Sequence, residues 1–343
     1  MRRRTFIASL GATAIIAPAI VCAQSTLRRR VGVLSNEPWR PLDGLRDGLK
    51  DLGYTEGQNI DFLVRYAAGD VERFTTFASQ LVRVPVDLIV AWGTPASLAA
   101  KAVTQSTPII MISGDPIAVG LVPGLAYPGG NVTGLSTLAA ELESKRIELM
   151  RELLPRLARI VVLSNPTNPY CSVAVESARR GAVALGVQID VINIAAVTDL
   201  DKAFLKLRNL RPDGVLVVAD PFLASQQTRI SSFLVEAGLP SIYTYGESVR
   251  SGGLMSYATN YYQLFRQAAV LADKILRGTK PSNLPVEQPT HFELTVNLKT
   301  AKALGLTVPP TLISRADEVI NSVPMLAFGP KADMAWCTAH VCF

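Results

Sequence analysis

The side chains best suited to chemistry in this sequence are hydroxyl, amide, carboxyl and aromatic groups that follow short apolar runs. The polar groups can hydrogen-bond a small polar molecule, and the aromatic rings can pack against an apolar part of it. We predict ligand contacts at Ser35, Asn36, Trp39, Gly93, Thr94, Ser113, Asp115, Asn165, Thr167, Asn168, Asp220 and Tyr245. The competing interpretation is that the Ser, Thr, Asn and Asp side chains cap helices that begin at these points.

The same residues lack the patterns that are typical of enzymes and metal sites. No serine among them lies in a Gly-x-Ser-x-Gly turn, and no histidine is near them in the sequence. Asp115 and Asp220 have no nucleophile or metal partner that would make them an acid/base pair. The four cysteines include no CxxC pair and there are only two histidines, which argues against zinc. We therefore expect no catalytic residue, no metal and no cofactor.

The apolar runs that precede these side chains occur twice along the chain. Val-Leu-Ser-Asn stands at 33–36 and again at 162–165, and further apolar runs recur about 130 residues apart. The runs are continuous instead of alternating, which is typical of parallel strands buried on both faces. Amphipathic segments such as 42–52 and 172–185 lie between them. This alternation predicts an α/β protein with two doubly wound, Rossmann-like parallel-sheet lobes in tandem.

Such a fold predicts where a ligand binds. In open α/β sheets, ligands bind beyond the carboxyl ends of the strands, where the predicted contact residues lie. If the two lobes face each other across a hinge, these turns converge on one cleft. The helix N-termini behind the turns favour an anionic group on the ligand.

Composition and charge exclude several classes of protein. The chain has 343 residues, 49% of them hydrophobic and 18% charged, which indicates a globular protein with more than one core. Half of the formal net charge of +6 comes from Arg2–Arg4, and most other basic residues are interleaved with acidic ones. We therefore expect no nucleic-acid partner.

The first 23 residues have the composition of an export signal. Arg2–Arg4 precede an uncharged stretch at 6–21, and Val21 and Ala23 fit the small-residue positions before a cleavage site. The stretch is shorter than the roughly 20 apolar residues of a membrane-spanning helix. We predict a signal peptide at 1–23 and a periplasmic, extracytoplasmic location. The basic start also resembles a twin-arginine signal, so both export routes stay open.

Several stretches together carry a resemblance to a known family. They are VGVLSN (31–36), WGTPAS (92–97), ISGDPIAVGLV (112–122), PGGNVTGLS (128–136), LSNPTNP (163–169) and NLKTAKALGLTVPPTLISRADEVI (297–320). In these stretches the chain resembles the substrate-binding proteins of ABC importers of the tryptophan/tyrosine type, which have the type I periplasmic-binding fold. The resemblance covers roughly residues 1–321.

The resemblance implies two lobes joined by a three-segment hinge that closes around the ligand. Lobe 1 would comprise 28–137 plus 262–290, and lobe 2 would comprise 138–261 plus 291–321. The implied function is the solute-binding component of an ABC importer. It would capture an amino acid or aromatic-type solute in the interlobe cleft and deliver it to a membrane permease with a cytoplasmic ATPase.

Three further expectations accompany this function. We expect the receptor to be a monomer. A periplasmic ligand-sensing module for a receptor kinase or chemoreceptor is the alternative, since no sequence feature separates sensing from transport. The segment 322–343 has no counterpart in the family and is expected to be a peripheral tail, in which Cys337 and Cys342 could form a disulfide in an oxidising compartment.

Overall fold

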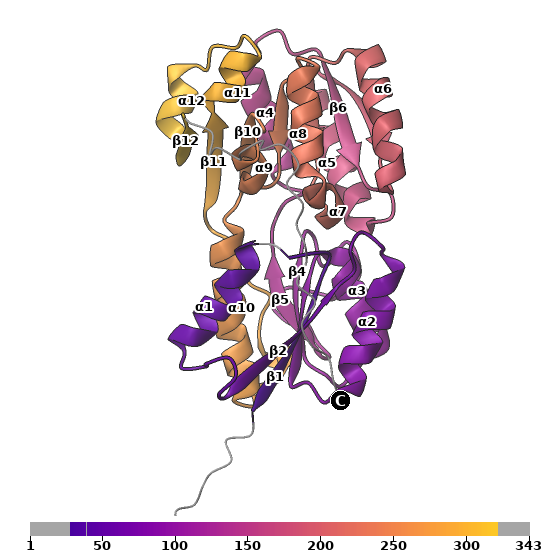
Figure 1. Ribbon diagram of the computed structural model, residues 1–343, viewed down its shortest axis with the longest axis vertical. Helices are drawn as coiled ribbons and strands as arrows, with labels where there is room; N and C mark the ends of the chain where they lie inside the picture. The colour runs from indigo at the N-terminus through magenta and orange to yellow at the C-terminus, as the bar shows by residue number, and fades with distance from the viewer. Residues whose placement is uncertain (1–27, 39, 322–343) are drawn as a thin grey trace, which may run out of the picture.

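The computed structural model describes residues 28–38 and 40–321. The predicted signal peptide, the predicted contact Trp39, and the tail with its cysteine pair lie outside the described residues. Two α/β lobes lie end to end along the long axis of the molecule (Figure 1).

Lobe 1 is built on a five-stranded, all-parallel sheet of order β2-β1-β3-β4-β5. Every residue of its strands β3, β4 and β5 is buried, which explains their continuous apolar runs. The elements of this lobe are β1 (Arg29–Ser35), η1 (Arg40–Leu42), α1 (Asp43–Asp51), β2 (Ile60–Tyr66), α2 (Glu72–Arg83), β3 (Leu88–Trp92), α3 (Thr94–Val103), β4 (Ile109–Ser113), β5 (Val132–Ser136), α10 (Tyr261–Leu276) and η3 (Pro281–Asn283).

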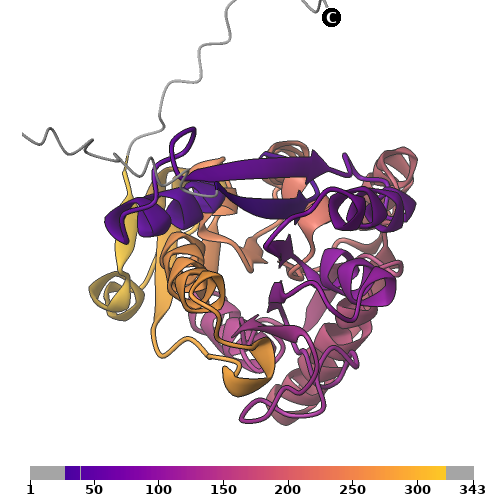
Figure 2. The ribbon, with the colours of Figure 1, turned by 90° about the horizontal axis from the view of Figure 1, so that it is seen from below.

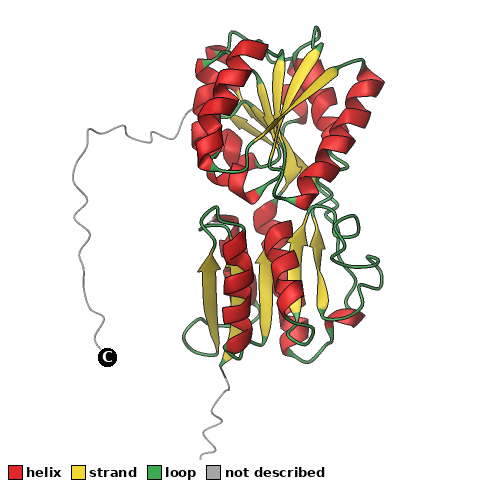
Figure 3. Cartoon of the chain, turned by 90° about the vertical axis from the view of Figure 1, so that its right-hand side faces the viewer, coloured by secondary structure: helices red, strands yellow, loops and turns green. Residues whose placement is uncertain are grey.

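Lobe 2 is built on a seven-stranded sheet of order β12-β11-β10-β9-β8-β6-β7, with helices on both faces (Figure 3). Its elements are α4 (Glu143–Leu153), β6 (Arg159–Ser164), α5 (Pro169–Leu185), β7 (Gln188–Asn193), η2 (Val197–Asp199), α6 (Leu200–Leu210), β8 (Gly214–Val217), α7 (Pro221–Ser225), α8 (Gln227–Glu236), β9 (Ser241–Tyr243), α9 (Gly246–Arg250), β10 (Met255–Thr259), β11 (Phe292–Asn297), α11 (Leu298–Ala303), α12 (Pro310–Arg315) and β12 (Glu318–Ile320).

The predicted arrangement of two α/β lobes, each built on a mainly parallel sheet, is confirmed. One detail differs from a purely parallel arrangement, because β11 runs antiparallel to β10. The chain leaves lobe 2 at the end of β10 and forms α10 in lobe 1, where α10 lies beside α1 (Figure 2). It then re-enters lobe 2 from the cleft side, so that β11 must run away from the cleft.

Hydrogen bonds tie two of the segments that pass between the lobes to each other. The Thr259 hydroxyl donates to the carbonyl oxygen of Thr137 at 3.2 Å. The buried Arg146 donates from Nε to the carbonyl of Tyr257 at 2.8 Å and from Nη1 to that of Ala139 at 3.0 Å. Leu138, which lies between Thr137 and Ala139, has a φ of +51°, a conformation that costs a non-glycine residue about 1–3 kcal/mol. These hydrogen bonds therefore hold the two connecting segments together as one hinge.

Candidate functional site

The strand ends of the two lobes converge on a cavity between them. The cavity is lined by Trp92, Gly93, Thr94, Ile112, Ser113, Gly114, Thr137, Asn168, Tyr170, Ala219, Pro221, Tyr245 and Tyr261. Its volume is about 20 Å³, which is room for about one water molecule. The lobes are therefore closed on each other in this structure, and side chains from both of them fill the cleft.

Lobe 1 contributes a helix N-terminus and a pair of hydroxyls to the cavity. The chain turns from β3 into α3 at Gly93, where a φ of +89° favours glycine. Because glycine has no side chain, the first turn of α3 has no side-chain cap. The Thr94 and Ser113 hydroxyl oxygens lie 2.8 Å apart and share a hydrogen bond. Pro95 has no N–H, so the N–H groups of Thr94 and Ala96, together with the helix dipole, make this end of α3 favourable for an anionic ligand group.

Lobe 2 contributes a network of amide and carboxylate groups. Asn168 caps α5 by accepting from the Tyr170 N–H at 3.1 Å, and its amide donates to Asp220 Oδ2 at 2.9 Å. Asp220 caps α7 through the Leu223 N–H at 2.8 Å and also accepts from the Asn165 amide. The capping interpretation therefore describes Asn168 and Asp220 in this conformation.

Aromatic side chains form another part of the wall. The rings of Trp92 and Tyr245 meet edge to face with centroids 6.5 Å apart, and the rings of Tyr245 and Tyr261 lie 5.1 Å apart. Burial raises the pKa of Tyr261 to about 12 and the pKa values of Tyr245 and Tyr170 well above the usual range. The three phenols are therefore neutral at physiological pH and can act as hydrogen-bond donors.

The predicted contact residues fall into three groups. Those that line the cavity are Gly93, Thr94, Ser113, Asn168 and Tyr245. Those that do not line it are Ser35, Asn36, Asn165, Thr167 and Asp220; among these, Asn36 donates to the carbonyl of Pro221 and Asp220 accepts from Asn168, two residues that do line it. Asp115 instead lines a neighbouring pocket of about 320 Å³, which shares Gly114 with the cavity and reaches the hinge at Leu138. Ligand contact by any of these residues stays a prediction.

Sequence reasoning missed two tyrosines that line the cavity. Tyr170 is the second residue of α5 and Tyr261 is the first residue of α10. Both follow an asparagine or Asn-Pro that caps the helix, and that signal could have placed them at the cleft. Tyr170 lies beyond the turn that directly follows β6, and Tyr261 lies where the chain crosses between the lobes, so that packing at the crossing is the simpler interpretation from sequence alone.

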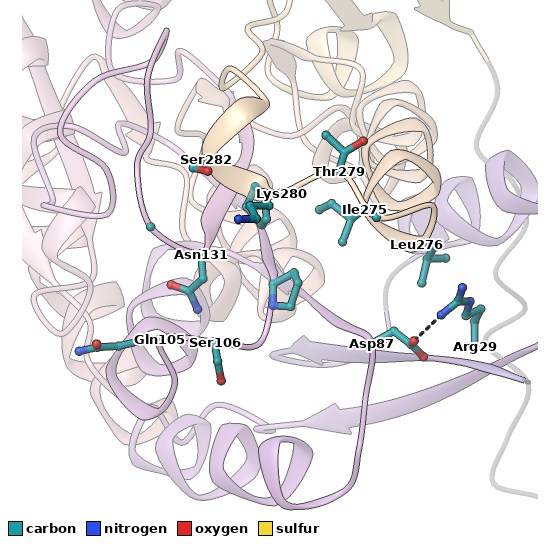
Figure 4. A pocket seen from close by; sticks show the side chains of 14 residues that line it. Arg29, Asp87, Gln105, Ser106, Asn131, Ile275, Leu276, Thr279, Lys280 and Ser282 are labelled. Carbon is teal, nitrogen blue, oxygen red and sulfur yellow. Dashed lines mark hydrogen bonds and ion pairs between the residues drawn. The ribbon is translucent and has the colours of Figure 1, made fainter.

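A larger pocket of about 400 Å³ lies at the far end of lobe 1 from the cleft (Figure 4). It lies near the beginnings of β1, β3, β4 and β5, and its wall includes the Arg29–Asp87 ion pair at 2.9 Å and Lys280. None of the predicted contact residues lines it. In a doubly wound sheet ligands bind at the opposite, carboxyl ends of the strands, so we place the candidate site between the lobes.

Within residues 28–38 and 40–321, no group of three or more His, Cys, Asp and Glu side chains is arranged to hold a metal ion. In the same part of the chain, no helix has the length and apolar character needed to cross a membrane.

Replacing Asp220 by asparagine should change how stability depends on pH. Burial raises the pKa of Asp220, against the opposing effect of its hydrogen bonds from Asn168, Leu223 and Asn165. A carboxyl group whose pKa is raised in the folded state loses stability as pH rises from its ordinary range through the raised pKa. Wild type should therefore gain stability relative to Asp220→Asn as the pH falls from about 7 to about 4. Urea unfolding across this range measures the difference, and a difference that is constant with pH contradicts the expectation.

Comparison with known proteins gives consistent matches. The model of the family of ABC transporter substrate binding proteins matches residues 39–320. A tyrosine-binding protein of Clostridioides difficile (strain R20291) is 30% identical over 287 residues, which are 82% of this chain and 82% of that protein.

Two solved structures are also similar over most of the chain. One is an ABC domain from Streptococcus pneumonia in complex with L-Trp, which is 27% identical with a TM-score of 0.80 and covers 85% of this chain and 100% of its own. The other is the ligand-free, open structure of a substrate-binding protein with adhesive properties from Clostridium difficile. It is 27% identical with a TM-score of 0.61 and covers 86% of this chain and 100% of its own.

Proposed function

Because the chain belongs to the family of ABC transporter substrate-binding proteins, we propose that it captures an aromatic L-amino acid between its lobes and delivers it to an ABC permease. The observation that carries this proposal is the pairing of two surfaces across the interlobe cavity. On one side stand the Thr94 and Ser113 hydroxyls at the uncapped N-terminus of α3. On the other are the rings of Tyr170 and Tyr245 in lobe 2, and the ring of Tyr261 at the start of α10 lies beside that of Tyr245.

The two surfaces suit the two ends of such a ligand. A carboxylate gains from the hydroxyls and from the positive end of the α3 dipole. The ring gains from stacking or edge contact with Trp92 and the tyrosines, about 0.5–1.5 kcal/mol per pair beyond burial. The names of the relatives support this class, since one is a tyrosine-binding protein and another was solved with L-Trp.

Binding requires the lobes to open and close. The cavity of about 20 Å³ is too small for an amino acid, so the ligand must enter an open form and the lobes must then close on it. At the same sequence identity, the chain superposes better on the L-Trp complex than on the ligand-free, open relative. This difference supports a closed arrangement of the lobes here.

The remaining parts of the proposal follow from the family. We propose a monomeric receptor outside the cytoplasm that performs no catalysis and docks on a permease with a cytoplasmic ATPase. We also propose the lobe boundaries given above, with lobe 1 at 28–137 plus 262–290 and lobe 2 at 138–261 plus 291–321.

A thermal-shift screen tests the proposed ligand class. The purified chain is heated with each of the aromatic amino acids, the aliphatic amino acids, aromatic carboxylic acids and purines. A ligand at 100 times its dissociation constant stabilises the fold by about 2.7 kcal/mol, which moves the midpoint by a few degrees. We expect a shift with an aromatic amino acid and a smaller one with its deaminated analogue. A response to purines but to no amino acid contradicts the proposed ligand class.

A further inference from the structure

We propose that the Tyr170 ring of lobe 2, seated against Gly114 of lobe 1, is the latch that holds the lobes closed and sets the affinity of the interlobe site. The part of this inference that concerns affinity rests on the proposed function, whereas the part that concerns closure does not. Neither residue needs to touch the ligand for the latch to act.

The contact between the two residues leaves no room for a side chain on Gly114. A Cβ atom built there would lie 2.2 Å from Cε2, 2.3 Å from Cδ2 and 2.7 Å from Cζ of Tyr170. The backbone of Gly114 is not in the left-handed region, so the tyrosine ring, and not the backbone conformation, accounts for the glycine. An alanine at this position can be accommodated only if the ring moves or the lobes separate.

Other contacts show that the two lobes pack closely around the contact between Tyr170 and Gly114. A Cβ on Gly93 would lie 2.6 Å from Cγ of Pro221 in lobe 2, and the Asn36 amide donates to the Pro221 carbonyl at 3.3 Å. Gly93 also has a φ of +89°, so a substitution there would strain its own lobe as well. Gly114 is therefore the position at which closure can be disturbed without straining the backbone.

One feature of the Tyr170–Gly114 contact disfavours the closed form. The Tyr170 hydroxyl is buried and has no hydrogen-bond partner among the described residues, although Glu143 and Arg146 act on it electrostatically. A buried hydroxyl without a partner disfavours the conformation that holds it. Tyr170→Phe keeps the ring on Gly114 and removes this penalty, so the phenylalanine variant should close at least as readily as wild type.

The experiment measures the closed fraction by energy transfer between two dyes. They are attached at Thr76→Cys on α2 and Lys206→Cys on α6, which are exposed positions on different lobes. Cys22, Cys337 and Cys342 are replaced by serine, and the buried Cys171 is kept. The closed fraction is measured with and without L-tryptophan as the probe ligand.

We expect Gly114→Ala to lower the closed fraction of the ligand-free chain at least tenfold. Because the closed form has no room for an amino acid, the dissociation constant for the probe should then fall and not rise. Gly124→Ala is the matched control, because Gly124 is also outside the left-handed region and a Cβ there would meet nothing within 4 Å. Tyr170→Ala removes the ring itself and should lower the closed fraction whether position 114 is glycine or alanine.

Two results overturn the latch: equal closed fractions in Gly114→Ala and Gly124→Ala, or no closed fraction in wild type with or without the probe. Failure of wild type to bind any aromatic amino acid counts against the proposed function instead. In that case the closed fraction without ligand still tests the latch.

Discussion

Replacing Arg146 by methionine lowers the free energy of unfolding by about 3–5 kcal/mol, because it leaves a buried carboxylate without its counter-charge. Arg146 and Glu143 are 1% and 0% exposed, and Nη1 lies 2.9 Å from Oε1. The carboxylate oxygens nonetheless have no hydrogen bond of good geometry within the described residues, so charge attraction is their main compensation. Burial raises the pKa of Glu143 while Arg146 opposes that shift.

Urea unfolding of Arg146→Met measures this loss, and two further variants separate its cause. Arg180→Met removes an exposed partner of Glu176 at i,i+4 spacing, where Glu143 and Arg146 are at i,i+3, and it should change stability little. The double variant Glu143→Leu with Arg146→Met removes both charges and should regain much of the loss. Equal effects of Arg146→Met and Arg180→Met contradict this account of the hinge.

Replacing Thr94 by valine weakens binding of an aromatic amino acid by roughly 10- to 150-fold. Valine keeps the shape of the side chain and removes the hydroxyl that we place against the ligand carboxylate. A hydrogen bond to a charged group contributes about 1.5–3 kcal/mol, which converts to that range of affinity. Titration calorimetry with L-tryptophan measures the change.

The matched control for Thr94 lies just beyond the other end of the same helix. Thr104 is also buried, and its hydroxyl accepts from the N–H groups of Ser106 and Thr107, away from the cavity. Thr104→Val should lower stability and leave affinity nearly unchanged. Equal losses of affinity in Thr94→Val and Thr104→Val indicate an indirect effect and contradict the proposed contact.

The sequence predicted the scaffold well because its signals are local and occur twice. Continuous apolar runs identify buried parallel strands, and the repeat of Val-Leu-Ser-Asn at 33–36 and 162–165 indicates two similar lobes. The polar turns after Trp92 and Ile112 reach the cavity because parallel strands present their carboxyl ends on one side.

The details that the sequence did not predict depend on contacts between distant segments. Asp220 accepts hydrogen bonds from Asn165 and Asn168, more than 50 residues away. The Tyr170 ring packs against Gly114 of the other lobe, where a larger residue would leave it no room. The antiparallel direction of β11 follows from the path of the chain through lobe 1, which local patterns do not encode.

The measurement that tests the central claim most directly is hydrogen–deuterium exchange of the chain with and without L-tryptophan. The account predicts simultaneous protection of the turn from β3 into α3 in lobe 1 and the turn from β6 into α5 in lobe 2, since a ligand between the lobes shields both. Protection confined to one lobe, or centred on the distant pocket beside Arg29 and Lys280, contradicts binding between the lobes.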